Sequence, residues 1–149
     1  MRILESAGVE YKVNYYDCEE FIDGVHIADQ LHQAYESSFK TLVAVGKSGK
    51  YFVFVIPIAE ELDLKAAAKS VDEKNVELIH VKDIRAVTGY IRGGCTAIGM
   101  KKDYPVVIDE TCILFDEIII SGGALGVQIF LSPEDFLRVT KAKTAALTV

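Results

Sequence analysis

Two apolar, β-rich runs on either side of a polar turn predict a β-hairpin over residues 39–57. The runs FKTLVAV (39–45) and YFVFVIP (51–57) are rich in β-branched and aromatic residues, and GKSGK (46–50) between them supplies a turn. Side chains alternate between the two faces of a strand, so in the first run the odd-numbered residues share one face. Lys40 lies on the other face, where it is a cation in an otherwise apolar row.

Helical spacing of apolar residues predicts an amphipathic helix between Gly24 and Ser37. Its expected buried stripe consists of Ile27, Leu31, Ala34 and Tyr35. The four positions follow one another at intervals that return to the same side of an α-helix. This segment is therefore expected to pack one face against the core.

Capping residues predict where three further helices begin or end. A helix at 63–70 can start on its first residue, an aspartate, and the last helix can start at Ser132 with Pro133 in its first turn. A short helix at 82–88 is expected to close at Gly89, because glycine readily adopts the left-handed conformation.

The remaining apolar runs are short and predict further strands. They are 76–79, 105–109, 116–121 and 126–131. With the hairpin they make six or seven short strands, and these do not alternate regularly with long helices, which argues against a doubly wound parallel fold. The sequence therefore predicts a single α+β domain over residues 1–149, with a mixed or largely antiparallel sheet, curled toward a barrel, and flanking helices.

Composition sets the class of protein. Half of the 149 residues are hydrophobic, so the chain can bury a core without a metal or disulfides. Its apolar runs are too short to span a membrane, and its N-terminus has no secretion signal. The three cysteines include no closely spaced pair, which suits a reducing compartment. We expect a cytoplasmic protein with no membrane partner.

Net charge limits the possible polyanionic partners. The formal charge of −6 would not draw the protein onto nucleic acid, so DNA is not expected as a partner and RNA would require a local patch or a helper protein. Candidate patches are Lys101–Lys102 with Arg92, and the group Arg138, Lys141 and Lys143. Alternatively, both groups are solvated surface charges that bind no RNA.

The glycine-rich stretch GYIRGGCTAIGMKK (89–102) could belong to several kinds of site. Gly94 and Gly99 have the spacing of a phosphate-binding loop, but Met100 replaces the lysine that such a loop needs. Cys95 could act as a nucleophile only beside a histidine or carboxylate, and no spacing ties one to it. The histidines and cysteines also lack metal-ligand spacing, so neither a metal nor another cofactor is expected.

Lys40 is the more unusual residue. It could be a strand-end lysine whose ammonium reaches water along an apolar stem. It could instead be a cation at the floor of a pocket, bonding a phosphate or a carbonyl oxygen, with Thr41 or Tyr16 as a neutral donor nearby.

Four separated segments resemble the YbaK/EbsC family in sequence, order and spacing. They are FKTLVAV, IPIAEELDLKAAAK, TGYIRGGCTAIGMKKDYPVVID and IIISGGALGVQIFL. The family comprises cytoplasmic aminoacyl-tRNA deacylases related to the editing insertion of bacterial prolyl-tRNA synthetase. The resemblance implies a mixed α/β domain around a curled, barrel-like sheet. It also implies trans-editing, in which the ester linking a wrong cysteine or alanine to tRNA(Pro) is cleaved, with the aminoacyl-tRNA 3′ end and prolyl-tRNA synthetase as partners.

The resemblance also implies site residues. Lys40 matches the essential lysine of the family, and Gly93 and Gly94 match the pocket loop, whose backbone N–H groups would stabilise an oxyanion. The substrate-binding residues implied are Tyr16, Thr41, Ser121, Gly122 and Gly123. In members that clear cysteine the substrate's own thiol attacks its ester, so Cys95 is expected to be a bystander.

Two departures from the family pattern bear on the substrate. Thr96–Ala97 stands where a Ser-Pro pair is usual, and Gln128 stands where an aspartate is frequent. Cys-tRNA(Pro) deacylation is the first interpretation. Ala-tRNA(Pro) hydrolysis by a bound water and a noncatalytic binding module of the same fold remain alternatives.

Overall fold

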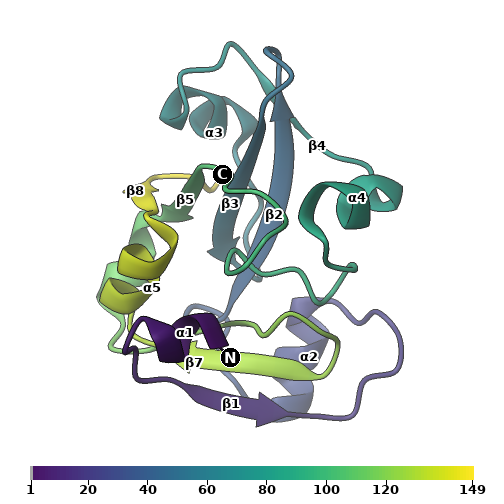
Figure 1. Cartoon of the computed structure of the whole chain (residues 1–149), viewed down its shortest axis with the longest axis vertical. Helices are drawn as coiled ribbons and strands as arrows, with labels where there is room; N and C mark the ends of the chain where they lie inside the picture. The colour runs from purple at the N-terminus through teal and green to yellow at the C-terminus, as the bar shows by residue number, and fades with distance from the viewer. Residues whose placement is uncertain (1) are drawn as a thin grey trace.

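The computed structural model describes residues 2–149, and their strands form two sheets. The first is antiparallel, with the order β1-β7-β6, and its strands are β1 (Lys12–Tyr15), β7 (Val127–Leu131) and β6 (Ile118–Ser121). The second is mixed, with the order β4-β2-β3-β5-β8, and its strands are β4 (Val76–Leu78), β2 (Phe39–Gly46), β3 (Tyr51–Pro57), β5 (Val106–Asp109) and β8 (Lys143–Ala145). In Figure 1 the hairpin β2–β3 rises away from the three-stranded sheet, which lies at the lower end of the molecule.

Short helices surround the two sheets. They are α1 (Arg2–Ser6), α2 (Gly24–Leu31), α3 (Leu64–Ser70), α4 (Ile84–Thr88) and α5 (Pro133–Thr140), with 3-10 turns η1 (Val81–Asp83) and η2 (Glu110–Leu114). Figure 1 shows α3 beside the upper part of the hairpin and α2 beside the three-stranded sheet. In the described part of the chain, no helix has both the length and the apolar character needed to cross a membrane.

The hairpin and the helix ends are confirmed. β2 and β3 pair antiparallel from Phe39↔Pro57 to Val45↔Tyr51. The Asp63 side chain accepts hydrogen bonds from two N–H groups in the first turn of α3, and the Ser132 side chain accepts one from Asp135 in α5. Helix α4 ends at Gly89, whose φ of 84° is left-handed. These caps satisfy backbone donors and acceptors that a helix leaves free at its ends.

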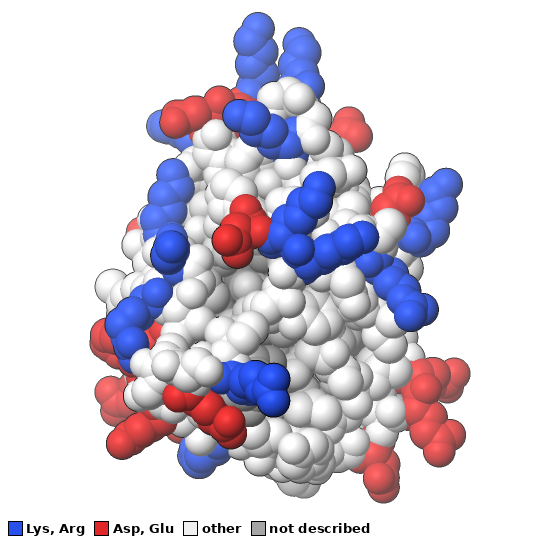
Figure 2. All heavy atoms as spheres, viewed as in Figure 1, with Lys and Arg blue, Asp and Glu red and all other residues white. Residues whose placement is uncertain are grey.

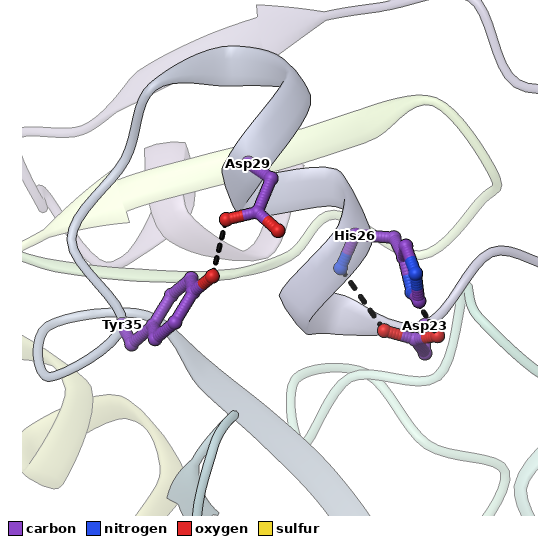
Figure 3. A network of polar contacts seen from close by, with 4 residues as sticks. All are labelled: Asp23, His26, Asp29 and Tyr35. Carbon is purple, nitrogen blue, oxygen red and sulfur yellow. Dashed lines mark hydrogen bonds and ion pairs between the residues drawn. The ribbon is translucent and has the colours of Figure 1, made fainter.

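The helix expected over 24–37 is shorter than the apolar spacing predicts. It ends at Leu31, because His32 adopts a left-handed conformation (φ 56°) and its N–H bonds back to the last carbonyls of the helix. Ala34 and Tyr35 therefore lie outside the helix. The Tyr35 hydroxyl donates to the Asp29 carboxylate, which holds the following segment against α2 (Figure 3).

The sheet prediction needs correction. The α+β class is confirmed, but no curled or barrel-like sheet is found, and the described strands number eight rather than six or seven. The two sheets meet through an isolated parallel bridge between Ser38 and Ile119, next to β2. Strands β1 and β8 escaped prediction because they are short and contain no buried residue, and they lack the apolar runs that marked the others.

The core covers both faces of the five-stranded sheet. One cluster packs this sheet against the three-stranded sheet, and it includes Val53, Val55, Ile108, Ile118 and Ile129. The other packs the opposite face against α3, and it includes Phe54, Ile56, Ala67, Ala68 and Leu147. A strand buried on both faces has a continuous apolar sequence, which explains the run YFVFVIP of β3.

Candidate active site

A cavity of about 430 Å³ lies along β2 and collects most of the predicted site residues. Those that line it are Tyr16, Lys40, Thr41, Gly93 and Ser121, and Gln128, where the family often has an aspartate, lines it as well. Cys95 also lines it, whereas the predicted residues Gly94, Gly122 and Gly123 are not among its lining residues. The structure thus brings together side chains that are far apart in sequence.

On the side away from β3, the pairing of β2 has a gap, and this part of the strand lines the cavity. At one end of the gap β4 pairs with Ala44–Gly46, and at the other end Ser38 forms its bridge with Ile119 in β6. Between them, Phe39–Val43 lines the cavity, and no strand among residues 2–149 pairs with these residues on this side. An open sheet edge presents unpaired peptide groups, so the cavity has polar backbone groups along β2 in addition to its polar side chains.

Lys40 contributes a half-buried cation to this cavity. Burial lowers the pKa of its ammonium group, and the nearby carboxylates of Glu61, Asp23 and Glu60 act in the opposite direction. None of the ion pairs among residues 2–149 includes Lys40. A desolvated ammonium without a close ion-pair partner interacts strongly with an anionic or carbonyl oxygen that enters the cavity.

Cys95 is a neutral thiol in this environment. Burial raises its pKa to about 11, against a smaller opposing effect of a hydrogen bond with Thr88. At pH 7 only about one molecule in 10⁴ would carry the reactive thiolate. The structure therefore favours the bystander interpretation of Cys95 over the nucleophile interpretation.

Replacing Cys95 by alanine is accordingly expected to leave the deacylation rate within about threefold of the wild type, because no covalent step passes through this thiol. The measurement is release of cysteine from Cys-tRNA(Pro) under single-turnover conditions. An inactive but folded Cys95→Ala protein would contradict the assignment. Reaction of Cys95 with iodoacetamide at pH 7 should also be slow in the wild type.

The two glycine loops contact each other next to the cavity. The Ser121 hydroxyl donates to the Gly93 carbonyl at 3.4 Å. A Cβ atom at buried Gly94 would lie 2.9 Å from the backbone Cα of Ala124, so only glycine allows this approach. The Gly94 N–H donates to the Ile91 carbonyl within its own loop, at 3.0 Å. Gly94 thus positions the loops, and its N–H is already bonded.

The second loop has two glycines with similar roles. A Cβ at Gly122 would lie 2.4 Å from Val127 Cγ1, and Gly123 has a φ of 100°, which other residues rarely adopt. These residues fix the path of the chain between Ser121 and β7.

A network of neutral amides surrounds the position where the family often has an aspartate. The Gln128 side chain is 8% exposed and exchanges two hydrogen bonds with Gln33, at 2.9 and 3.0 Å. Its oxygen also accepts from the Asn14 amide at 3.2 Å. Position 128 is therefore polar and uncharged. Gln33 and Asn14, which hold its amide, are far from it in the sequence. No sequence pattern pointed to Gln33 or Asn14.

The residues that line the cavity include a stacked pair and a capping aspartate. The Arg92 guanidinium lies 3.8 Å from the ring centroid of Phe21, and both residues line the cavity. Asp23 accepts from the His26 N–H at 3.0 Å and contacts the His26 ring nitrogen at 2.6 Å (Figure 3). These hydrogen bonds lower the pKa of Asp23. Within residues 2–149, no group of three His, Cys, Asp or Glu side chains is arranged to hold a metal ion.

The face of the protein in Figure 2 carries both basic and acidic side chains. Lys and Arg lie at the top, along the left margin, across the middle and at the right, and Asp and Glu lie among them and toward the lower left and lower right. Lys102 and Lys141, from the two patches noted in the sequence, line a second cavity of about 440 Å³. Arg138 is different, because its guanidinium bonds the Asp135 carboxylate and the Ala7 carbonyl.

Comparison with known proteins identifies the family to which this chain belongs. Residues 24–139 match the family described as the aminoacyl-tRNA editing domain, and the chain belongs to this family. Its relative EbsC of Enterococcus faecalis, whose name gives a provisional Cys-tRNA(Pro)/Cys-tRNA(Cys) deacylase activity, is 42% identical over 149 residues. The match covers 99% of this chain and 91% of that protein. The resemblance found in the sequence is thereby confirmed.

Solved structures show the same fold. One, described provisionally as a trans-editing enzyme for prolyl-tRNA synthetase, superposes with a TM-score of 0.87 at 24% identity and covers 99% of this chain and 93% of that one. Another, of a hypothetical protein, has a TM-score of 0.89 at 18% identity and covers 99% and 97% of the two chains. At these identities the likeness shows the fold alone.

Proposed function

We propose that this protein is a trans-editing aminoacyl-tRNA deacylase that releases cysteine from mischarged tRNA(Pro). Family membership and the relative EbsC support the reaction class. The observation that carries the proposal is the placement of Lys40, a half-buried ammonium on the open edge of β2, in one cavity with Gly93 and Ser121. The whole chain, residues 1–149, acts as one editing domain.

In this proposal the substrate supplies its own nucleophile. The cysteinyl sulfur adds to the ester carbonyl carbon, the bond from that carbon to the ribose oxygen breaks, and the thiol proton passes to the ribose oxygen. The cysteine leaves as a cyclic thioester that water opens. Because Cys95 is protonated, the protein's part is to orient the substrate and to stabilise charge on the carbonyl oxygen.

Lys40 supplies the charge in this scheme. Its ammonium donates to the carbonyl oxygen or to the terminal phosphate, while the Tyr16 hydroxyl and the Thr41 and Ser121 side chains contact the aminoacyl group or the terminal adenosine. Gly93 forms the cavity wall on the side of the glycine loop.

The remaining partners follow from the charge distribution. The protein is acidic as a whole, with a formal charge of −6, so its local basic side chains give only limited affinity for tRNA. Prolyl-tRNA synthetase is the partner that would raise this affinity, by holding tRNA(Pro) at a high effective concentration.

The test compares the release of three amino acids from the same tRNA. Cysteine is expected to leave tRNA(Pro) at least about 10-fold faster than alanine or serine, because an intramolecular thiol has a high effective concentration. Serine is the matched control, since it replaces the thiol by a less nucleophilic hydroxyl. Equal release of cysteine and alanine would favour hydrolysis by a bound water, and release of none would favour a noncatalytic binding module.

A further inference from the structure

Alternate peptide groups of β2 face opposite edges of the strand. On one side, the Ser38 carbonyl accepts from Ile58 and the Gly46 N–H donates to Lys50, so even-numbered residues bond toward β3. In an antiparallel ladder, the residues between such pairs direct both of their peptide groups to the other side. Odd-numbered residues of β2 therefore face away from β3.

The odd-numbered residues have neighbours at both ends of the cavity. At the β4 end, Val43 accepts from the Ile79 N–H at 3.0 Å. At the β6 end, the Ser37 carbonyl accepts from the Ile119 N–H at 2.9 Å. Thr41 lies between these contacts, where neither β4 nor β6 pairs with β2. Its N–H and C=O consequently point away from β3, on the side where no β4 or β6 residue pairs with it, and Thr41 is one of the residues that line the cavity.

We propose that the Thr41 peptide groups bind the aminoacyl part of the substrate as a one-residue addition to the edge of β2. The Thr41 carbonyl accepts from the α-ammonium group, and the Thr41 N–H donates to the ester carbonyl oxygen. An aminoacyl ester keeps the N–Cα–C=O unit of a residue, and two residues facing each other in an antiparallel ladder exchange these two bonds. This inference rests on the proposed deacylase function and names how that site holds its substrate.

In this arrangement the Thr41 N–H is the donor to the oxyanion. The Gly94 N–H of the glycine loop does not fill this role. The Gly94 N–H is bonded to Ile91, whereas the Thr41 N–H points away from β3 in the part of β2 that lines the cavity. When a nucleophile adds to the ester carbon, the carbonyl oxygen becomes negative and its hydrogen bond to Thr41 strengthens. A donor fixed in a strand needs no reorganisation at that moment.

The arrangement also explains how a cavity with a neutral residue at position 128 can bind an ammonium group. The Thr41 carbonyl takes the place of a carboxylate acceptor, and Gln128 remains in its amide network. Asp23 adds a negative charge to the cavity lining, which favours a cation in this region.

The experiment removes the Thr41 N–H and keeps the ladder with β3. Thr41→Pro lacks the donor, and because this N–H does not bond to β3 the strand can accept a proline there, as edge strands do. Thr41→Val serves as the comparison, since it also lacks the hydroxyl but keeps the N–H. Single-turnover release from Cys-tRNA(Pro) is expected to be about 10- to 100-fold slower for Thr41→Pro than for Thr41→Val. Equal rates would overturn the inference.

A backbone substitution covers the case in which Thr41→Pro does not fold. Replacing the amide between Lys40 and Thr41 by an ester, through chemical synthesis, removes the N–H and leaves every side chain in place. The same slow release is expected, and an unchanged rate in this folded variant would overturn the inference. A wild-type protein that releases no cysteine from Cys-tRNA(Pro) would instead overturn the proposed function.

Two ligand measurements test the inference without relying on catalytic rates alone. With the wild type, 3-mercaptopropionyl-tRNA(Pro), which lacks the ammonium group, is expected to have a KM at least about 10-fold higher than Cys-tRNA(Pro). A nonhydrolysable analogue, 3′-cysteinylamino-3′-deoxyadenosine, is expected to slow hydrogen exchange at the Thr41 amide. Equal KM values, or a bound analogue that leaves this amide unprotected, would contradict the one-residue addition.

Discussion

Replacing Lys40 by methionine is expected to lower kcat/KM for Cys-tRNA(Pro) by about 10²- to 10³-fold, the usual effect of losing one charge-stabilising donor. The same change is expected to raise the Tm by up to about 4 °C, because it relieves the cost of burying an ammonium group. Burial is the main reason that the pKa of Lys40 is lowered. Methionine has a similar length and no charge, so it fills the same space.

The pH dependence follows from the direction of this pKa shift. Between the lowered pKa of Lys40 in the folded protein and its ordinary value of 10.5, the unfolded chain holds a proton that the folded protein has lost. In this range the free energy of unfolding rises with pH, and the stability advantage of Lys40→Met shrinks. Deacylation activity is expected to fall with pH instead. It needs the ammonium form of Lys40, which is lost as the pH passes the lowered pKa of this group.

The matched control is Lys65→Met on the exposed surface of α3. It is expected to change neither the Tm nor kcat/KM by a measurable amount, because an exposed lysine is already solvated. Thermal unfolding measures the Tm of the two variants, and single-turnover deacylation measures their activity. A Lys40→Met protein with near-normal activity would remove Lys40 from the site.

Replacing Gly94 by alanine is expected to lower deacylation by more than about 100-fold, since small displacements of positioned groups cost large factors in rate. The added Cβ would lie 2.9 Å from the Ala124 Cα and 3.1 Å from the Ala124 N, and backbone atoms cannot rotate away as a side chain can. The two loops must separate, which moves Gly93 and Ser121 relative to Lys40. Buried overpacking of this kind also lowers stability by about 1–3 kcal/mol.

Gly46→Ala provides the control for this substitution. The Cβ at Gly46 would meet the side chain of Glu73, and the nearest atom is the carboxylate oxygen at its flexible end. Neither Gly46 nor Gly94 has a positive φ, so the two substitutions differ mainly in what the methyl group meets. Gly46→Ala should keep wild-type deacylation, and a Gly94→Ala protein that also kept it would refute the close-approach role.

Local patterns were sufficient for much of the fold. The hairpin followed from two β-rich runs around a glycine turn, and the α3 and α5 starts followed from Asp63 and Ser132, because caps and turns depend on neighbouring residues. The end of α2 did not follow, since the left-handed turn at His32 interrupts an apolar spacing that continues through Tyr35.

The site was only partly accessible from the sequence. The alternation in β2 marked Lys40 as unusual, but its grouping with Gly93 and Ser121 came from the family resemblance. The gap in pairing beside the cavity depends on where β4 and β6 stop pairing with β2, and this is set by contacts far apart in the chain. The same applies to the bonds of Gln33 and Asn14 to Gln128, and to the contact of Gly94 with Ala124.

The alternation of peptide groups in β2 restricts insertions and deletions more than substitutions. Adding or removing one residue between Ser38 and Thr41 would turn the peptide groups that now point away from β3 toward it. The same change would carry the Lys40 side chain across to the opposite face of the sheet. In a collection of variants of this chain, this stretch should therefore accept changes of side chain at several positions and hold a constant length.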